Sequence, residues 1–169
     1  MANVQLYADS AMSAADIAEL HADHVAVATG AQWTNLLYSP LEIPVGTLSG
    51  ERVFTPDDVF AGRVVGDRIL VFDFDNYYMG GVIAEHLASK DHSVVYATPA
   101  GQASAWTIMT NELPFVYQAL REHKVEILTT ANLTAFDGST ATLGNLHTGE
   151  PCQRQVDGCL LYTSDDADE

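Results

Sequence analysis

A dense group of carboxylates and aromatic side chains follows an apolar run near the middle of the sequence. The run RILVF is followed by DFDNYYMGG, residues 73–81. In dinucleotide-binding folds this place carries a G-x-G-x-x-G loop, whose glycines let pyrophosphate approach the backbone and the helix N-terminus. Here Asp73 and Asp75 stand near the glycine positions, and ionised carboxylates repel phosphate. The next strand, SVVYAT, ends in Thr98-Pro99 and lacks the acid or arginine that holds the ribose of NAD or NADP. The sequence therefore predicts a dinucleotide-binding type of fold without a working NAD(P) site.

An alternative interpretation takes Asp73 and Asp75 as the strand-end D-x-D pair of haloacid dehalogenase-type enzymes. In that chemistry the first aspartate attacks phosphate and the second handles the proton of the leaving group. It also needs a downstream lysine and further magnesium-binding acids, and neither Lys90 nor Lys124 is convincingly placed for that role. Because short motifs often match by chance, we favour the first interpretation.

The remaining candidates for chemistry are two pairs of side chains. His21 and His24 lack a third ligand nearby, which makes surface histidines the better interpretation. Cys152 and Cys159 match neither a redox C-x-x-C motif nor a zinc knuckle, and we interpret both as incidental. We predict no catalytic residue and no metal site in this chain.

The carboxylate loop lies inside a predicted strand, helix, strand unit. RILVF indicates a strand that is covered on both faces, and the helix after it has one apolar face. That face is formed by Met79, Val82, Ile83 and Leu87. Such a βαβ unit is right-handed and places any ligand at the carboxyl ends of its strands. Residues 73–81 would therefore line that edge.

The segments after this unit continue the α/β pattern. We expect a helix over about residues 112–124 and a third parallel strand at VEILTT. A hairpin signal at Asp137-Gly138 predicts a small antiparallel meander, after which VDGCLLYT could return to the main sheet. The predicted fold class is α/β, with a Rossmann-like parallel sheet, helices on both faces and a small antiparallel β-meander.

The segments before this unit are predicted to belong to a second α/β domain. A strand is expected at Val4–Tyr7, a short helix after the capping-box pair Ser13 and Asp16, and a buried strand at HVAVATG. A connector punctuated by glycine and proline then runs over residues 31–53, long enough to cross between domains.

The charge of the chain excludes several classes of partner. With 23 acidic and 7 basic residues, its net charge is −16. Nucleic acids and anionic membrane surfaces would repel such a protein. The sequence has no apolar stretch of membrane-spanning length and no secretory signal pattern at its start. We expect a cytoplasmic protein that binds neither nucleic acid nor membrane.

Several segments together resemble the C-terminal half of the trimethylamine dehydrogenase group, within the old yellow enzyme (NADH:flavin oxidoreductase) class. They are HADHVAVATGA, FTPDDVFAGR, the βαβ unit and SAWTIMTNE. The resemblance spans about residues 3 to 158. Its most specific parts are the D-x-D-x-Y-Y-M-G-G loop and the S-A-W-T segment, Ser104 to Thr107.

This resemblance implies a larger enzyme with several cofactors. Such enzymes have an N-terminal (β/α)8 barrel that holds FMN, a cysteine-bound 4Fe-4S cluster, and two domains resembling those of disulfide reductases. The whole enzyme would oxidatively demethylate or deaminate a small amine and pass electrons to a protein acceptor. The implied partners of this chain are the missing barrel domain and an electron-transfer protein, and the chain alone would be inactive.

The resemblance also implies a domain organisation. Residues 1–50 would end an FAD- or ADP-binding domain, in which Thr29, Gly30 and Ala31 are the possible nucleotide contacts. Residues 51–158 would form an NAD(P)-binding-like domain with a degenerate glycine loop. Residues 159–169 form a tail, CLLYTSDDADE, that is close to the translation of a common transposon-derived sequencing adapter. We expect native sequence to stop near Gly158.

Two other functions remain open on the sequence. One is an NAD(P)H-dependent flavin reductase resembling dienoyl-CoA reductase, which would require the acidic loop to accept a dinucleotide. The other is a stand-alone, non-catalytic binding module that docks a partner through its acidic surface.

Overall fold

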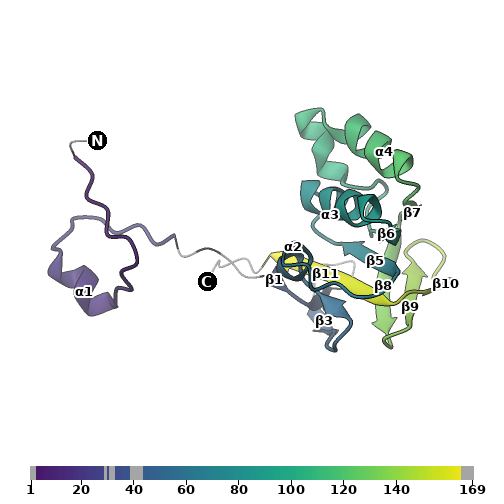
Figure 1. Ribbon diagram of the computed structural model, residues 1–169, viewed down its shortest axis with the longest axis horizontal. Coiled ribbons are helices and arrows are strands. Elements are labelled where there is room, and N and C mark those ends of the chain that lie inside the picture. The colour runs from purple at the N-terminus through teal and green to yellow at the C-terminus, as the bar shows by residue number, and fades with distance from the viewer. Residues whose placement is uncertain (1–2, 29, 31–32, 39–43, 165–169) are drawn as a thin grey trace. The chain divides into compact units, whose positions relative to one another are not determined.

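The computed structural model describes residues 3–28, 30, 33–38 and 44–164. They divide into two units, residues 1–30 and residues 31–169, and each unit is considered by itself (Figure 1). The connector of residues 31–53 therefore goes with the larger unit. The domain boundary predicted near residue 50 concerns a longer protein and stays a prediction.

The smaller unit contains one helix, α1 (Ala14–Glu19), and the predicted capping box is confirmed. The backbone N–H of Asp16 donates to the Ser13 hydroxyl, and the Asp16 carboxylate accepts from the Ser13 N–H at 2.7 Å. These local bonds satisfy backbone groups at the start of the helix.

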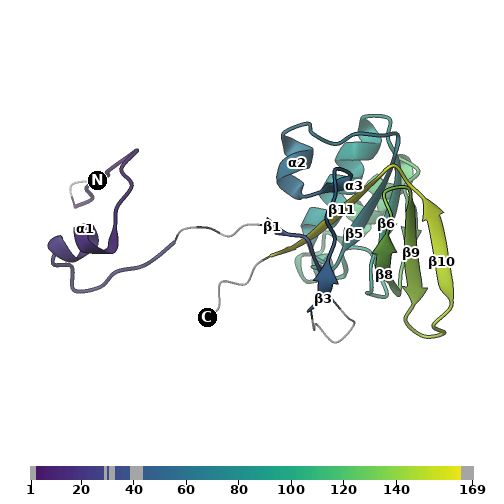
Figure 2. The same cartoon turned by 90° about the horizontal axis from the view of Figure 1, so that it is seen from below.

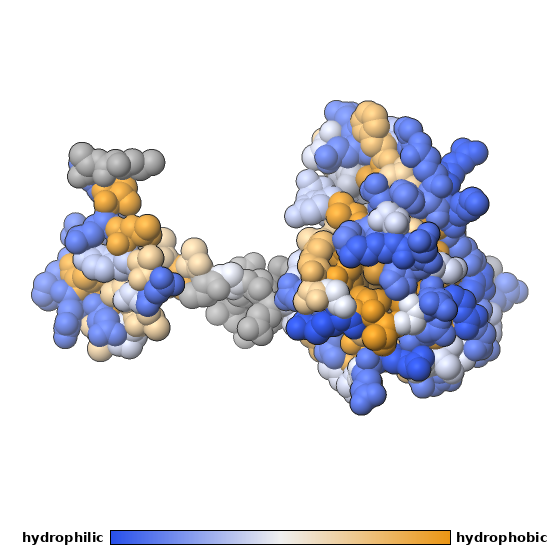
Figure 3. All heavy atoms as spheres, viewed as in Figure 1, coloured by the Kyte–Doolittle hydropathy of each residue, from blue (hydrophilic) through white to orange (hydrophobic). Residues whose placement is uncertain are grey.

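The two strands predicted in this unit are wrong for the described residues. Residues 4–7 and 24–28 have no regular structure, and their apolar side chains lie on the surface (Figure 3). Val27, for example, is 78% exposed. A strand needs a hydrogen-bonded neighbour, and no described segment of this unit pairs with either stretch. Both segments have the apolar pattern of a strand, but no strand among the described residues of this unit lies beside them.

The larger unit is built on a mainly parallel sheet with the order β1-β11-β5-β6-β7. β4 pairs in parallel with β11, and β1 is antiparallel to it. The strands are β1 (Trp33–Thr34), β4 (Val53–Phe54), β5 (Arg68–Asp73), β6 (Ser93–Ala97), β7 (Glu126–Leu128) and β11 (Gly158–Ser164). The predicted βαβ unit and the return of the last strand to the main sheet are both confirmed.

Helices cover one face of this sheet. They are α2 (Pro56–Phe60), α3 (Tyr78–Ser89), the 3-10 helix η1 (Ala105–Thr110) and α4 (Leu113–Glu122). Ile83 and Leu87 of α3 and Leu120 of α4 pack on Val71 and Leu160 of the sheet. Because side chains alternate along a strand, the intervening residues face the other way.

An antiparallel sheet covers the other face, which confirms the meander and corrects the expectation of helices on both faces. Its strands are β8 (Ala131–Phe136), β9 (Thr140–Asn145) and β10 (Pro151–Gln155). Leu133 and Leu143 pack against Leu70, Phe72 and Leu161 of the main sheet. Figure 2 shows the two layers on opposite sides of β5 and β11. A separate hairpin joins β2 (Leu36–Tyr38) to β3 (Pro44–Thr47) within the connector.

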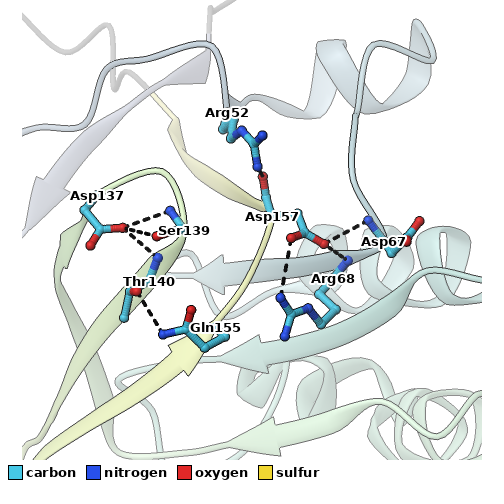
Figure 4. A network of polar contacts seen from close by, with 8 residues as sticks. All are labelled: Arg52, Asp67, Arg68, Asp137, Ser139, Thr140, Gln155 and Asp157. Atoms are coloured by element: carbon cyan, nitrogen blue, oxygen red, sulfur yellow. Dashed lines mark hydrogen bonds and ion pairs between the residues drawn. The ribbon is translucent and has the colours of Figure 1, made fainter.

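Asp157 ties the beginnings of β5 and β11 together at the amino end of the sheet (Figure 4). Its carboxylate accepts from the N–H groups of Asp67 and Arg68 at 3.1 and 2.9 Å and pairs with the Arg68 guanidinium at 3.5 Å. The Arg52 guanidinium donates to its carbonyl at 3.2 Å. The backbone N–H of Arg68 is the main cause that lowers the pKa of Asp157. This bond set is structural and lies at the end of the sheet opposite to the carboxylate loop.

The predicted hairpin turn at Asp137-Gly138 is also present. The Asp137 carboxylate accepts from the N–H groups of Ser139 and Thr140 at 2.8 and 2.7 Å (Figure 4). These backbone bonds lower the pKa of Asp137. Gly138 has a φ of 93°, a conformation that glycine adopts without strain.

Candidate functional site

A buried carboxylate closes the carboxyl edge of the parallel sheet. Asp73 ends β5 and is 0% exposed. It accepts hydrogen bonds from the Tyr162 hydroxyl of β11 and from the backbone N–H of Asn76, both at 2.8 Å, and from the Tyr96 hydroxyl of β6. Three strands of the sheet therefore converge on one carboxyl group at the place where a dinucleotide-binding fold receives phosphate.

Asn76 fixes the loop that follows. Its side-chain amide donates to the Phe74 carbonyl at 2.6 Å, and its side-chain oxygen accepts from the Thr98 hydroxyl at 2.6 Å. Its own carbonyl accepts from the N–H of Trp106 at 2.9 Å. Asn76 has a φ of 60°, which asparagine tolerates better than most residues. The loop is therefore bonded to η1 and to Thr98, the residue that follows β6.

The S-A-W-T segment and the residue before it are held by two tyrosine hydroxyls. The Ser104 N–H donates to the Tyr96 hydroxyl at 2.9 Å, and the Ala103 N–H donates to the Tyr117 hydroxyl at 3.0 Å. A Cβ at Gly81 would lie 2.9 Å from the Ser104 hydroxyl, so glycine allows α3 to approach this segment. The two motifs that carried the resemblance thus form one packed structure.

The glycines of the loop serve helix packing. A Cβ at Gly80 would lie 2.6 Å from Cγ of Asp73 and 2.7 Å from the Tyr162 hydroxyl, distances that are sterically forbidden. Glycine at this position lets α3 pack against the buried carboxyl group. No lysine or arginine occurs in residues 73–81. The residues present therefore do not fit a pyrophosphate, since the position that phosphate would need holds a carboxyl group.

Burial changes the acidity of this group. It raises the pKa of Asp73 to about 6, against the opposing effect of hydrogen bonds from Tyr96, Tyr162 and Asn76. The same burial, together with the nearby carboxylate, raises the pKa of both tyrosines above their ordinary value. The two hydroxyls therefore stay protonated and remain donors.

We expect Asp73 to make the stability of the larger unit depend on pH. Because its pKa in the folded state lies above the ordinary 3.8, its stabilising contribution is complete below about pH 4 and is lost as the pH rises through about 6. The free energy of unfolding of the wild type, relative to Asp73→Asn, should fall by about 3 kcal/mol over this window. Urea titrations of both proteins at a series of pH values measure the difference, and a difference that is independent of pH would contradict the assignment.

The same geometry excludes Asp73 as a phosphate-attacking nucleophile. A nucleophilic carboxylate must be ionised and accessible to its substrate. Asp73 is fully buried, and both of its oxygens accept hydrogen bonds from the protein, so no substrate can reach them. The haloacid dehalogenase interpretation of the D-x-D pair is therefore wrong.

The other residues singled out in the sequence lie in several parts of the chain. Thr29 and Ala31 lie outside the described residues, and Gly30, with a φ of 78°, belongs to the smaller unit. Cys159 is buried, and burial raises the pKa of its thiol to about 12. Cys152 accepts from the Arg154 guanidinium at 2.8 Å. Within the part of the chain that the structure describes, no three His, Cys, Asp or Glu side chains could hold a metal ion, and no helix is long and apolar enough to cross a membrane.

Sequence reasoning missed Tyr96 and Tyr162, which complete the site. Each tyrosine lies in an otherwise apolar strand, and a buried tyrosine hydroxyl requires a partner. A tyrosine in a strand predicted to be buried therefore indicates a buried hydrogen-bond partner for its hydroxyl. This signal could not identify Asp73 as the shared partner, because Tyr162 lies 89 positions away in the sequence.

The fold defines a class: a Rossmann-like α/β domain with a β-meander, in which the buried Asp73 and its donors lie at the carboxyl edge of the parallel sheet. Residues 54–164 match the family model of the "OYE-like second alpha/beta domain". The chain belongs to this family.

Known amine-oxidising enzymes are similar to this chain. Dimethylamine dehydrogenase from Hyphomicrobium sp. (strain x) is 30% identical over 151 residues, covering 87% of this chain and 20% of that protein. The structure of 6-hydroxypseudooxynicotine amine oxidase from Pseudomonas geniculata N1 superimposes with a TM-score of 0.86 and 32% identity over 99% of this chain and 26% of its own. The structure of histamine dehydrogenase from Rhizobium sp. 4-9 superimposes with a TM-score of 0.85 and 30% identity, over 98% of this chain and 26% of its own. The chain thus spans about a fifth to a quarter of the length of these relatives.

Proposed function

We propose that this chain is a structural, nucleotide-binding-like region of a flavin-dependent enzyme that oxidises a small amine. The observation that carries the proposal is the buried Asp73 with its tyrosine donors, which lies at the carboxyl edge of the sheet in a domain of the OYE-like second alpha/beta family. Other dinucleotide-binding folds receive phosphate at this edge. The names of the relatives supply the class of reaction, which is the oxidation of an amine. The region would hold the shape of the enzyme and contribute no group to the chemistry.

The cofactors of the whole enzyme would lie outside this region. The resemblance implies FMN and a 4Fe-4S cluster in an N-terminal barrel, and ADP or FAD in the domain that residues 1–50 would end. Among the described side chains there is no cluster of ligands that could hold the iron. Thr29, Gly30 and Ala31 remain the proposed contacts to ADP or FAD. We derive no catalytic step from the residues of this chain.

The proposed partners follow from the same assignment. The first is the barrel domain of the same polypeptide, and the second is an electron-transfer protein that accepts electrons from the whole enzyme. A net charge of −16 argues against nucleic acid and anionic membranes as partners. We propose a cytoplasmic location.

Titration with NADH and NADPH tests the proposal against the dienoyl-CoA-reductase-like alternative. We expect no binding at micromolar concentrations, because a dinucleotide would have to displace Asp73 and its donors. The double variant Asp73→Gly, Asp75→Gly should gain weak binding at most. Isothermal titration calorimetry of both proteins, with folding checked by circular dichroism, gives the answer. Micromolar binding by the wild type, as tight as that of the variant, would sink the proposal in favour of the reductase.

A further inference from the structure

Large apolar side chains stand exposed around the closed loop, on three segments that adjoin one another. The backbone of η1 is bonded to the loop, and α4 packs against both α3 and η1. The exposed fractions range from 45% to 76%. We call these side chains the aromatic face: Tyr78, Val82, Trp106, Ile108, Met109 and Phe115. Single exposed apolar residues are ordinary on a protein surface, but six of them on three adjoining segments, three of which line one groove, indicate a contact surface.

Three residues of the aromatic face line a groove. It has a volume of about 670 Å³ and lies between α3 and α4, with Tyr78 and Val82 on one side and Phe115 on the other. Glu85 and Glu112 also line it, and no lysine, arginine or histidine does. The complementary surface would therefore present apolar side chains into the groove and basic groups toward its two carboxylates.

Backbone hydrogen bonds within the chain hold the segments that carry the aromatic face. The N–H of Trp106 is bonded to the Asn76 carbonyl, and the N–H of Glu112 is bonded to the Thr107 carbonyl at 3.0 Å. Ser104 and Asn111, which flank η1, both have left-handed backbones, with φ of 49° and 62°. Such conformations persist where the surrounding contacts hold them, and they concentrate at functional sites. A preorganised face loses little conformational entropy when it binds.

Composition and the length of the relatives indicate what covers the face. Tryptophan, tyrosine, phenylalanine and methionine are the residues enriched at the cores of protein interfaces. The two amine-oxidising enzymes align with 99% and 98% of this chain, which makes up only 26% of each of theirs. In those proteins about three quarters of the polypeptide lies outside the equivalent region.

We infer that the aromatic face docks against the remainder of a longer amine dehydrogenase-type polypeptide, on a surface with an apolar centre and a basic rim. This inference rests on the proposed function and adds to it the place of contact. The groove between α3 and α4 would receive apolar side chains of that remainder. Glu85 and Glu112 would pair with basic groups at the edge of the contact.

The test uses histamine dehydrogenase from Rhizobium sp. 4-9 produced without the segment equivalent to this chain, its fold checked by circular dichroism. The full chain is titrated into it by isothermal titration calorimetry. We expect a complex, and we expect the double variant Trp106→Ser, Phe115→Ser to bind at least about tenfold more weakly, since buried aromatic anchors dominate interfaces. Val65→Ser is the matched control, because Val65 is 56% exposed and lies outside the face. It should bind like the wild type.

The outcomes separate the inference from the function on which it rests. If all three proteins bind equally, the aromatic face is the wrong surface, while the proposed function stands. If the wild type does not bind at all, the inference fails, while the titration with NADH and NADPH decides the proposed function separately. Sedimentation velocity of the chain alone covers a further case. A dimer that the double variant abolishes would assign the face to a second copy and overturn the inference.

Discussion

A chain that ends at Gly158 should lose the cooperative unfolding of the larger unit. The truncation removes Cys159, Leu160, Leu161 and Tyr162, each 0% exposed, from the strand between β5 and the pair β1 and β4. Deleting one buried leucine side chain costs about 3 kcal/mol. The loss of four buried side chains and of the backbone bonds to β1, β4 and β5 exceeds the roughly 5–15 kcal/mol that stabilise a typical domain. Urea denaturation followed by circular dichroism measures the effect.

The matched control is a chain that ends at Ser164. It lacks only the acidic end of the tail and should unfold like the full chain, since the last strand is kept whole. A truncated chain ending at Gly158 that still shows a single sharp transition at the same urea concentration would contradict the central position of β11.

The second large effect is expected from Asp73→Ala. At about pH 5 the Asp73 side chain of the wild type is mostly protonated and uncharged. The change in the free energy of unfolding then reports the lost hydrogen bonds and not the removal of a buried charge. The variant leaves the hydroxyls of Tyr96 and Tyr162 and the N–H of Asn76 without their acceptor. Each orphaned buried group costs about 1–3 kcal/mol, and we expect a total loss of about 4 kcal/mol in the free energy of unfolding. Chemical denaturation at that pH measures it.

Two further variants decide whether this loss comes from the hydrogen bonds. Asp73→Asn keeps one oxygen acceptor at the same place and should lose less than Asp73→Ala. Glu85→Ala removes an exposed carboxylate from α3 and should change the free energy of unfolding by no more than about 0.5 kcal/mol. If Asp73→Ala unfolded like Glu85→Ala, the carboxylate would not be the structural centre of the loop.

The parallel core could be predicted because its signals are local. RILVF and SVVYAT are apolar in the positions that a doubly covered strand requires, and the apolar positions of α3 have the period of a helix. Ile83 and Leu87 of the predicted apolar face are buried, whereas Val82 is 45% exposed, which corrects its placement on that face. The turn at Asp137-Gly138 is likewise determined by neighbouring residues. The unsuitability of the loop for phosphate followed from the side chains at its glycine positions.

Other features depend on contacts that no local pattern contains. The meander was predicted, but its position on the second face of the sheet was not, because a strand buried on both faces has the same sequence pattern under helices and under a sheet. The role of Asp73 depends on Tyr162, far away in the sequence. HVAVAT has the composition of a buried strand but no partner strand among the described residues of its unit. Composition predicts the need for a neighbour and cannot supply one.

Sequencing the genomic DNA around this reading frame tests the central claim most directly. We expect the upstream sequence to encode a (β/α)8 barrel with a cysteine cluster, followed by a dinucleotide-type glycine loop whose flanking strands would pair with HVAVAT. Beyond Gly158 we expect native codons for an apolar strand in the position of β11 and for further sequence of the same domain. A start codon at Met1 with no such domains upstream, and a stop codon after residue 169, would contradict the amine dehydrogenase assignment and favour a small binding module.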